Sequence, residues 1–267
     1  MIKILSLEFK KSLRVKSLVI IPTYNEIENI ELIIRSIFSL KTTFDILIID
    51  DGSPDKTAEK VKDLQNEFNS KHQQLHLIER KEKLGLGTAY LKGFEFALAN
   101  NYDYVFEMDA DFSHDPKDLK RLLRAARVEG YDLVIGSRYI EGVNVVNWPL
   151  GRVLLSYIAS LYTRIITGMP VHDATAGFKC YKIKVLRTID LSAIRFVGYA
   201  FQIEMKFNAW KHGFKIKEIP IVFTDRIRGD SKMSIKIFNE ALFGVIQMKV
   251  GSLFKKYKKV NRTVSTV

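Results

Sequence analysis

Cysteine is almost absent from this chain of 267 residues, which excludes several classes of protein. The single cysteine, Cys180, allows neither an internal disulfide nor a cysteine-rich zinc site. A chain without disulfides is typical of a reducing compartment. We therefore expect Cys180 to be a small residue of the protein core.

Long apolar runs are missing as well. The sequence contains no run of about 18 consecutive apolar residues, the length that a membrane-spanning helix needs. Residues 1–16 are basic but lack the apolar centre and the cleavage site of a signal peptide. These absences predict a cytoplasmic protein that associates with a membrane only peripherally.

Nucleic-acid-binding motifs are also lacking, although the chain is strongly basic. It has 42 lysine and arginine residues against 30 aspartate and glutamate residues, a net charge of +12. Such a charge predicts an anionic partner. Because no aromatic RNA-binding motif or zinc-finger spacing is present, we expect phosphorylated substrates and an anionic membrane surface, and no nucleic acid.

The apolar pattern predicts an α/β fold. Short apolar runs that read as buried strands alternate with segments of helical apolar spacing. Strands that alternate with helices form a mainly parallel central sheet flanked by helices. The predicted strands cover residues 17–21, 44–49, 75–78, 102–108, 131–135 and 216–223, and the last helix covers residues 235–254.

An acidic stretch at residues 106–114, F-E-M-D-A-D-F-S-H, carries the clearest chemical signal. Asp109 and Asp111 follow the fourth predicted strand, at the edge where open α/β sheets bind ligands. Two carboxylates suit a divalent ion such as Mg²⁺ or Mn²⁺, which can also hold a diphosphate. Taken alone, the pair is a weak signal, because Asp111 or Ser113 could simply cap the next helix.

Two further polar turns follow predicted strands. Residues 22–26 read P-T-Y-N-E, with Thr23 or Asn25 as the expected N-cap of a helix. Residues 50–55 read D-D-G-S-P-D, and one of these aspartates could accept hydrogen bonds from a base or a ribose. Gly85 and Gly87 lack the third glycine of a dinucleotide-binding loop and a P-loop lysine, so we reject both of those sites.

Together these motifs resemble a known family. The stretches P-T-Y-N-E, D-D-G-S-P-D, D-A-D and R-x-x-G-x-S-K, the last at residues 226–232, are similar to those of family-2 nucleotide-sugar glycosyltransferases of GT-A fold. The subgroup that the chain resembles is the dolichyl- or polyprenyl-phosphate mannose synthases without transmembrane helices. That resemblance implies inverting transfer of mannose from GDP-mannose to a polyprenyl or dolichyl phosphate.

The resemblance also implies site residues. The family's nucleotide pocket falls on Pro22, Tyr24, Glu26, Ile49 and Asp51. Its metal and diphosphate site falls on Asp109, Ala110, Asp111, Phe112 and Ser113, with Asp109, Asp111 and Ser113 as the implied ligands of Mg²⁺ or Mn²⁺. Some relatives have glutamine where this chain has Ser113.

Basic residues complete the implied site. They fall on Arg138, Arg152, Arg226 and Lys232, which together with Asp109 and Asp111 are the implied catalytic residues. Arg138, Arg226 and Lys232 would contact the nucleotide sugar, while Arg138 and Arg152 would bind the acceptor phosphate. A lipid phosphate is already an anion near neutral pH, so it needs a cationic clamp rather than a general base. Lys179 stands where relatives commonly carry arginine.

The sequence leaves other functions open. A UDP-sugar could replace GDP-mannose in a glucosyl- or N-acetylhexosaminyltransferase that uses the same acceptor. A polysaccharide acceptor would require a base, for which Glu204 is the candidate. A non-catalytic, membrane-associated nucleotide-binding module is the alternative outside enzymes.

The domain organisation follows from the same features. We predict a basic N-terminal extension at residues 1–16, a GT-A domain at residues 17–234, and an amphipathic helix with a basic tail at residues 235–267. The last segment combines an apolar helix face with Lys255, Lys256, Lys258 and Lys259, a combination that can lie on an anionic bilayer. Packing of this helix on its own domain is equally compatible with the pattern.

Overall fold

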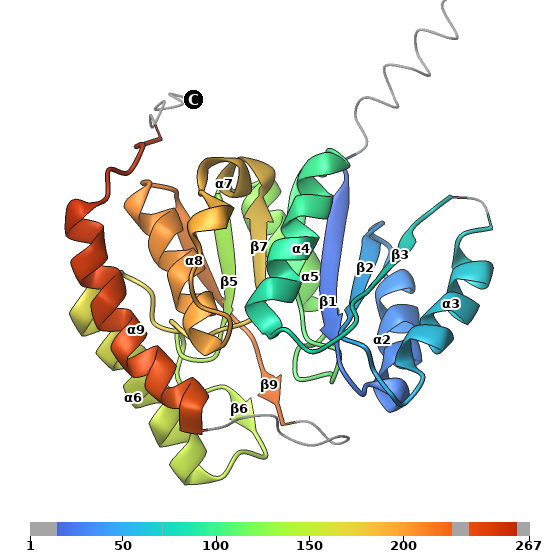
Figure 1. Ribbon diagram of the computed structural model, residues 1–267, viewed down its shortest axis with the longest axis horizontal. Helices are drawn as coiled ribbons and strands as arrows, with labels where there is room; N and C mark the ends of the chain where they lie inside the picture. Colours follow the sequence, from blue (N-terminus) through green and yellow to red (C-terminus); the bar gives the residue numbers. More distant parts are fainter. Residues whose placement is uncertain (1–14, 71, 226–234, 261–267) are drawn as a thin grey trace, which may run out of the picture.

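A seven-stranded sheet forms the centre of the molecule (Figure 1). The computed structural model describes residues 15–70, 72–225 and 235–260. The sheet strands are β1 (Ser17–Thr23), β2 (Asp45–Asp50), β3 (Leu75–Glu79), β4 (Tyr104–Glu107), β5 (Leu133–Ser137), β7 (Lys179–Lys182) and β8 (Ile216–Pro220). Their order is β3-β2-β1-β4-β7-β5-β8.

Helices cover both faces of this sheet. One face carries α2 (Ile27–Phe38), α3 (Thr57–Phe68) and α5 (Asp118–Arg127), and the other carries α4 (Leu86–Ala99), α7 (Ile183–Thr188) and α8 (Tyr199–Lys211). Because both faces are covered, the strands are apolar on both sides. In β1, Leu18 and Ile20 pack in the cluster with α4, whereas Val19 and Ile21 pack in the cluster with α2.

Two long helices lie beyond α8, at the left of Figure 1. They are α6 (Leu150–Thr167) and α9 (Ile235–Phe254), which contact each other while α9 also packs on α8. The remaining elements are the short helix η1 (Leu191–Ala193) and a two-stranded sheet of β6 (Val145–Val146) and β9 (Phe223–Thr224). Among the described helices, none is long and apolar enough to cross a membrane.

The predicted α/β class and mainly parallel sheet are confirmed, with two differences in the strands. β7 runs antiparallel between β4 and β5 and was not predicted, because its four residues, K-C-Y-K, begin and end with lysine. The single strand predicted for residues 216–223 is wrong in its extent. It ends at Pro220, and residues 223 and 224 pair separately as β9.

The predicted cap of the second element is also wrong. α2 has Glu26 at its N-cap position, and no side chain there caps the helix. Instead, the backbone amide of Ile27 donates to Asp55 at 3.0 Å, so a neighbouring loop caps the helix. Thr23 donates to Asp50. Residues 1–14 of the predicted extension and 261–267 of the predicted tail lie outside the described residues.

Candidate functional site

The two carboxylates of the acidic stretch lie where parallel strands end. The β1–β4 register places Glu107 beside Ile20, so the chain leaves β4 next to the C-terminal end of β1. Asp109 and Asp111 follow directly. The side chain of Asp109 is 38% exposed, whereas Asp111 is only 9% exposed. The sheet edge therefore presents Asp109 to solvent and holds Asp111 more deeply.

The turn after Asp111 has an unusual backbone conformation. Phe112 has φ of +60°, a region that bulky residues rarely adopt. The backbone amide of Ser113 then donates to Asp111 Oδ1 at 3.1 Å. Strained residues of this kind concentrate at functional sites, where the surrounding structure holds them in place. The turn thus fixes the position of Asp111.

A buried tyrosine lies behind the same carboxylates. Tyr90 is fully buried on α4, and its hydroxyl group interacts with Asp109. Burial raises the pKa of Tyr90 well above its ordinary value, and the negative charges of Asp109 and Glu107 raise it further. Tyr90 therefore keeps its proton and can donate it in a hydrogen bond to Asp109.

The acidic pair fits a divalent ion that also binds a substrate. Within the described residues there is no group of three or more histidine, cysteine or acidic side chains that could hold a metal by itself. Mg²⁺ is commonly bound by one or two carboxylates together with substrate phosphates, so Asp109 and Asp111 suffice for that mode. Ser113 is 3% exposed, and its role as a third ligand stays a prediction.

A charged pair is buried beneath this edge of the sheet. Lys179 on β7 and Glu107 on β4 are both fully buried, with 3.0 Å between Lys179 Nζ and Glu107 Oε2. Tyr181 donates to Glu107 Oε1 at 2.8 Å, and Lys179 donates to Gln202 Oε1. Burial lowers the pKa of Lys179, while Glu107 raises it. The charge of Lys179 is therefore balanced by Glu107 inside the protein.

Gln202 contacts Lys179 of this buried pair, and Gly177 lies near both Gln202 and Asp109. It is 2% exposed, and its Nε2 has no hydrogen-bond partner. A Cβ placed on Gly177 would lie 3.9 Å from Gln202 Nε2 and 3.9 Å from Asp109 Oδ2. Gly177 thus lies between the amide and the carboxylate, and leaves space there that a side chain would fill.

The residues of the implied nucleotide pocket gather at the ends of β1 and β2. Pro22 pairs with Ile49 in the register of the two strands. The side chain of Ile49 is fully buried in the core, so only its backbone can contact a ligand. Tyr24 and Glu26 lie in the turn after β1, and Lys83 Nζ is 4.6 Å from the centre of the Tyr24 ring.

Asp51 has a partner that the sequence did not indicate. Arg80 donates from Nε to Asp51 Oδ1 at 2.6 Å, and its Nη1 donates to Thr88 at 2.7 Å. Burial raises the pKa of Asp51, and the hydrogen bond and charge of Arg80 oppose that shift. Arg80 therefore holds the carboxylate in place at the end of β2.

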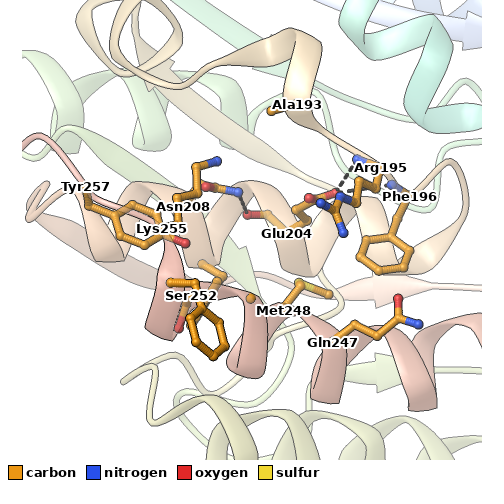
Figure 2. Close-up of a pocket in the computed structure, with 13 residues that line it drawn as sticks. Ala193, Arg195, Phe196, Glu204, Asn208, Gln247, Met248, Ser252, Lys255 and Tyr257 are labelled. Carbon is orange, nitrogen blue, oxygen red and sulfur yellow. Dashed lines mark hydrogen bonds between the residues drawn. The ribbon is translucent and has the colours of Figure 1, made fainter.

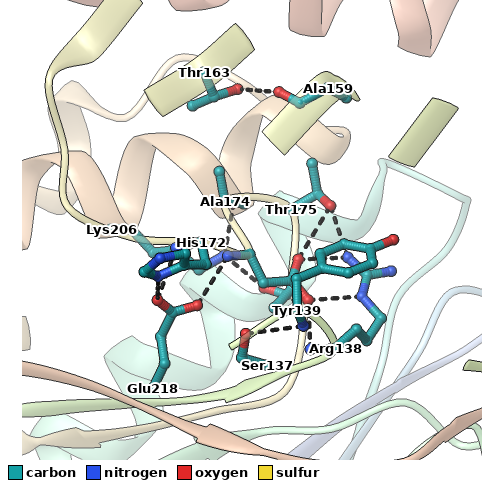
Figure 3. Close-up of polar contacts among 12 residues, drawn as sticks. Ser137, Arg138, Tyr139, Ala159, Thr163, His172, Ala174, Thr175, Lys206 and Glu218 are labelled. Atoms are coloured by element: carbon teal, nitrogen blue, oxygen red, sulfur yellow. Dashed lines mark hydrogen bonds and ion pairs between the residues drawn. The ribbon is translucent and has the colours of Figure 1, made fainter. Parts of the chain in front are cut away.

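Arg138 is held by a buried carboxylate (Figure 3). Its Nε donates to Asp173 Oδ2 at 2.7 Å and its Nη2 to Asp173 Oδ1 at 2.6 Å. Nη2 also donates to Thr175 at 2.8 Å. Arg138 is 8% exposed. The guanidinium is thus fixed in one orientation, and Asp173 offsets much of its charge.

The second predicted acceptor residue, Arg152, lies against the same aromatic ring as Arg138. The guanidinium carbons of Arg152 and Arg138 are 4.1 Å and 5.4 Å from the centre of the Trp148 ring. Arg152 lies in the first turn of α6 and donates to Asp225 at 2.8 Å. Its side chain is 29% exposed. The structure therefore brings the two predicted acceptor residues together.

Phe223 links this basic group with the acidic stretch. Its ring lies 5.6 Å from the Arg138 guanidinium and 5.3 Å from the ring of His114. The next residue, Thr224, donates from its backbone to the carbonyl of Ser113. The predicted residues Arg226 and Lys232 follow β9 but lie outside the described residues.

The structure thus adds positioning residues that sequence reasoning missed. Most of them contact a predicted site residue directly, and Gln202 contacts the buried Lys179. They are Arg80, Trp148, Asp173, Gln202, Phe223 and Asp225.

Glu204, the candidate base for a hydroxyl acceptor, lies elsewhere (Figure 2). Its carboxylate accepts hydrogen bonds from the backbone amides of Arg195 and Phe196 at 3.0 and 3.2 Å. It lines a cavity of 520 Å³ between α8 and α9, and burial raises its pKa. None of the predicted site residues that the structure describes lines that cavity, so Glu204 is not positioned with Asp109 and Asp111.

Comparison with known proteins gives consistent matches. A family profile described as glycosyl transferase family 2 matches residues 18–190. Polyprenol monophosphomannose synthase of Mycolicibacterium smegmatis is 43% identical over 247 residues, covering 92% of both chains. Undecaprenyl-phosphate mannosyltransferase of Micrococcus luteus is 45% identical over 228 residues, 85% of this chain and 91% of that protein.

Solved structures resemble the fold at lower identity. Glucosyl-3-phosphoglycerate synthase from Mycobacterium tuberculosis, in complex with Mn²⁺, UDP and glucosyl-3-phosphoglycerate, has a TM-score of 0.63. Its sequence is 20% identical, and the match covers 92% of this chain and 82% of that one. The same enzyme with Mn²⁺ and UDP-glucose gives 0.62. At such identity the likeness concerns the fold alone.

Proposed function

The chain belongs to glycosyl transferase family 2, and from this membership we propose that it transfers mannose from GDP-mannose to a polyprenyl phosphate, with GDP as the second product. One observation carries the proposal. Two curated relatives that match this chain over most of both lengths are each named for joining mannose to a polyprenyl phosphate.

The donor would bind along the ends of β1, β2 and β4. The nucleotide would contact Pro22, Tyr24, Glu26 and Asp51, and the diphosphate would lie near Asp109 and Asp111. A divalent ion held by these two carboxylates would supply positive charge to the leaving diphosphate. Arg226 and Lys232 are further predicted partners of that diphosphate.

Neighbouring residues hold the carboxylates of the donor site in fixed orientations. Arg80 orients Asp51, and the turn at Phe112 together with the Ser113 amide orients Asp111. Tyr90 interacts with Asp109 through its hydroxyl group and helps to hold that carboxylate in place. Such preorganised groups stabilise the developing charge without reorganising during the reaction.

The acceptor phosphate would attack the donor sugar without the help of a general base. An oxygen of the polyprenyl phosphate would form a bond to the anomeric carbon of mannose as the bond from that carbon to the diphosphate breaks. A single displacement of this kind inverts the anomeric configuration. The acceptor phosphate is already an anion, so Arg152 and Arg138 would orient it, and no carboxylic acid needs to take a proton.

Arg152 and Arg138 would contribute differently to this step. Arg152 lies on the rim of the site and shares only a partly exposed pair with Asp225, so a phosphate can compete for it. Arg138 is held by Asp173 and keeps the Trp148 and Phe223 rings in contact with it. We therefore assign phosphate capture mainly to Arg152, and the shaping of the site to Arg138.

The nature of the acceptor also determines where in the cell the enzyme would act. A polyprenyl phosphate resides in a membrane, so the enzyme would associate peripherally with the membrane surface. GDP-mannose as donor implies its cytoplasmic face. The basic character of the chain suits an anionic lipid surface.

Radiolabel transfer tests the proposed function. Purified protein is incubated with labelled GDP-mannose, or in parallel with UDP-glucose, and a short polyprenyl phosphate with Mn²⁺ or Mg²⁺. We expect a metal-dependent mannolipid that Asp111→Asn abolishes. Label from UDP-glucose alone would overturn the donor, and transfer from neither donor would overturn the proposed transfer to a polyprenyl phosphate.

A further inference from the structure

The helix α6 turns its polar side toward the protein and its apolar side toward solvent. The residues that it buries against the protein are polar: Ser160, Thr163 and Thr167. The residues that it exposes to solvent include Leu150, Leu154, Ile158, Leu161 and Ile165, which are between 39% and 82% exposed. An amphipathic helix on a protein surface normally buries its apolar stripe instead. Water alone is therefore a poor environment for the outer side of α6.

The spacing of the exposed residues makes a continuous stripe. Positions 150, 154, 158, 161 and 165 recur every three or four residues, which places them on one side of a helix. The buried hydroxyl groups of Thr163 and Thr167 donate to the carbonyls of Ala159 and Thr163 at 2.8 and 2.6 Å. The hydroxyl groups of Thr163 and Thr167 are thereby satisfied within the helix, while the apolar side of α6 is largely exposed.

The neighbouring helix α9 extends this apolar surface. Phe243, Ile246, Val250, Leu253 and Phe254 are between 44% and 84% exposed. Tyr162 donates to the carbonyl of Leu242 at 2.9 Å, and Lys249 to that of Thr167 at 3.3 Å. Residue 162 contacts residue 242 and residue 167 contacts residue 249, so the residue numbers of both helices increase in the same direction. The two helices therefore lie side by side and parallel (Figure 1). We call the exposed apolar residues of both helices the α6–α9 face.

Most charges around the α6–α9 face are positive, although Arg152 pairs with Asp225 and the start of α9 contains Glu240. α6 contains Arg152 and Arg164 and no acidic residue, and residues 242–260 contain lysines at 249, 255, 256, 258 and 259 and no acidic residue. A second copy of the chain docked face to face would bring these cations together. An anionic surface would instead be attracted by them.

The position of this face relative to the site indicates which kind of partner binds to it. Arg152, the proposed phosphate-binding residue, lies in the first turn of α6, two residues after the exposed Leu150 and on the other side of the helix from the apolar stripe. A bilayer in contact with α6 would therefore present lipid phosphates at the level of Arg152. At a rise of about 1.5 Å per residue, the eighteen residues of α6 would lie along about 27 Å of membrane surface.

We propose that the α6–α9 face is the membrane-docking surface of this protein, with α6 lying in the interface of an anionic bilayer and delivering the membrane-borne acceptor to Arg152. This inference rests on the proposed function only for the identity of the acceptor. The docking itself follows from the exposed stripe and the positive charges. Interfacial helices bind through such an apolar face together with attraction to anionic lipid.

Vesicle binding by the full chain tests the proposal without any sugar donor. Sedimentation with vesicles of phosphatidylcholine mixed with phosphatidylglycerol is compared for the wild type and the variant Ile158→Gln/Ile165→Gln. These residues are 50% and 70% exposed. Because both substitutions are neutral, they remove apolar contact without adding repulsion, and we expect binding to fall by about tenfold or more.

The matched control is Leu32→Gln/Val128→Gln, at positions that are 47% and 73% exposed on α2 and at the end of α5. It should bind vesicles as the wild type does. Equal binding by both variants, or no vesicle binding by the wild type, would overturn the proposal. A third result would also overturn it: light scattering shows that the wild type is a dimer and the α6 variant a monomer, and neither protein binds vesicles. A second copy of the chain would then cover the face.

Transfer assays with two acceptors distinguish the membrane-docking proposal from the proposed mannosyltransferase activity. If the chain is a mannosyltransferase, the α6 variant should lose transfer to a long polyprenyl phosphate in vesicles but keep transfer to a short water-soluble acceptor within about twofold. If no transfer is seen with either acceptor, vesicle binding still decides whether the α6–α9 face docks on membranes. Equal loss with both acceptors would contradict a role of α6 in delivering the lipid.

Discussion

Arg138 and Asp173 form a two-fold hydrogen bond in the interior of the site, with distances of 2.7 and 2.6 Å. Asp173 is fully buried and also accepts from the backbone amide of Arg138 at 2.9 Å. Burial by itself raises the pKa of Asp173, but the charge and hydrogen bonds of Arg138 lower it below its ordinary value. The carboxylate therefore stays ionised and Arg138 stays fixed.

Removing the charge of Asp173 should destabilise the fold. Asp173→Asn leaves the buried Arg138 without its counter-charge, and we expect the free energy of unfolding to fall by about 3 kcal/mol in urea titrations. Asp225→Asn is the control, because its pair with Arg152 is partly exposed and is worth less than about 1 kcal/mol. Equal losses would contradict the structural role of Asp173. For the same reason, Arg138→Ala is a poor probe of catalysis.

Glu107 and Lys179 should show strong coupling in a double-mutant cycle. Either Lys179→Met or Glu107→Gln leaves one buried charge unpaired, which should cost about 3 kcal/mol or more. The double variant leaves no charge and should recover much of that loss. Urea unfolding of all four proteins measures the coupling. Additive losses in the double variant would mean that the two charges do not compensate each other.

His114 predicts a pH dependence of stability. Its ring is 2% exposed and stacks on Phe178 at 4.9 Å, and burial lowers its pKa from 6.5 to about 4. Between pH 6.5 and about pH 4, the unfolded state therefore binds a proton at His114 more readily than the folded state does. Stability should be complete above pH 6.5 and fall by about 3 kcal/mol as the pH drops to about 4.

Comparison of two histidine variants checks this contribution. In metal-free protein, His114→Gln should flatten the pH profile of unfolding in that range, since the group that takes up the proton is gone. His72→Gln should leave the profile unchanged, because His72 is exposed. A profile that is the same in the His114 variant and the wild type would assign the pH dependence to other groups.

Arg152 should act on the acceptor and not on the nucleotide. Arg152→Ala removes the proposed phosphate contact, and we expect kcat/KM for polyprenyl phosphate to fall by about 10²- to 10³-fold. GDP affinity, measured by calorimetry, should change by less than about twofold. Arg121→Ala is the control, because this arginine is 51% exposed on α5 and pairs only with a neighbour in its own helix. Parallel loss of GDP affinity would contradict the assignment of Arg152.

Local sequence predicted the acidic edge of the site well. Asp109 and Asp111 follow an apolar strand directly, and the position of a strand's end depends on only a few neighbouring residues. The partners of the predicted arginines were not predictable, because Asp173 lies 35 residues from Arg138 and Asp225 lies 73 residues from Arg152. Such contacts depend on the arrangement of whole elements.

The outward orientation of α6 shows another limit of sequence patterns. Residues 153–166 have the apolar spacing of a helix, and α6 spans that range. Periodicity gives the side on which apolar residues gather, but not whether that side faces the protein or its surroundings. β7 was missed for a related reason: Lys179 is fully buried, and lysine is normally read as a sign of exposure.

The antiparallel strand β7 has a consequence for how the chain folds during synthesis. β5 and β8 join the rest of the sheet only through β7, which comes after α6 in the sequence. Until residue 182 has left the ribosome, β4 has no neighbour on that side, and β5 has no place in the sheet. The nascent chain therefore exposes an open strand edge for roughly a quarter of its translation, until β7 pairs with it.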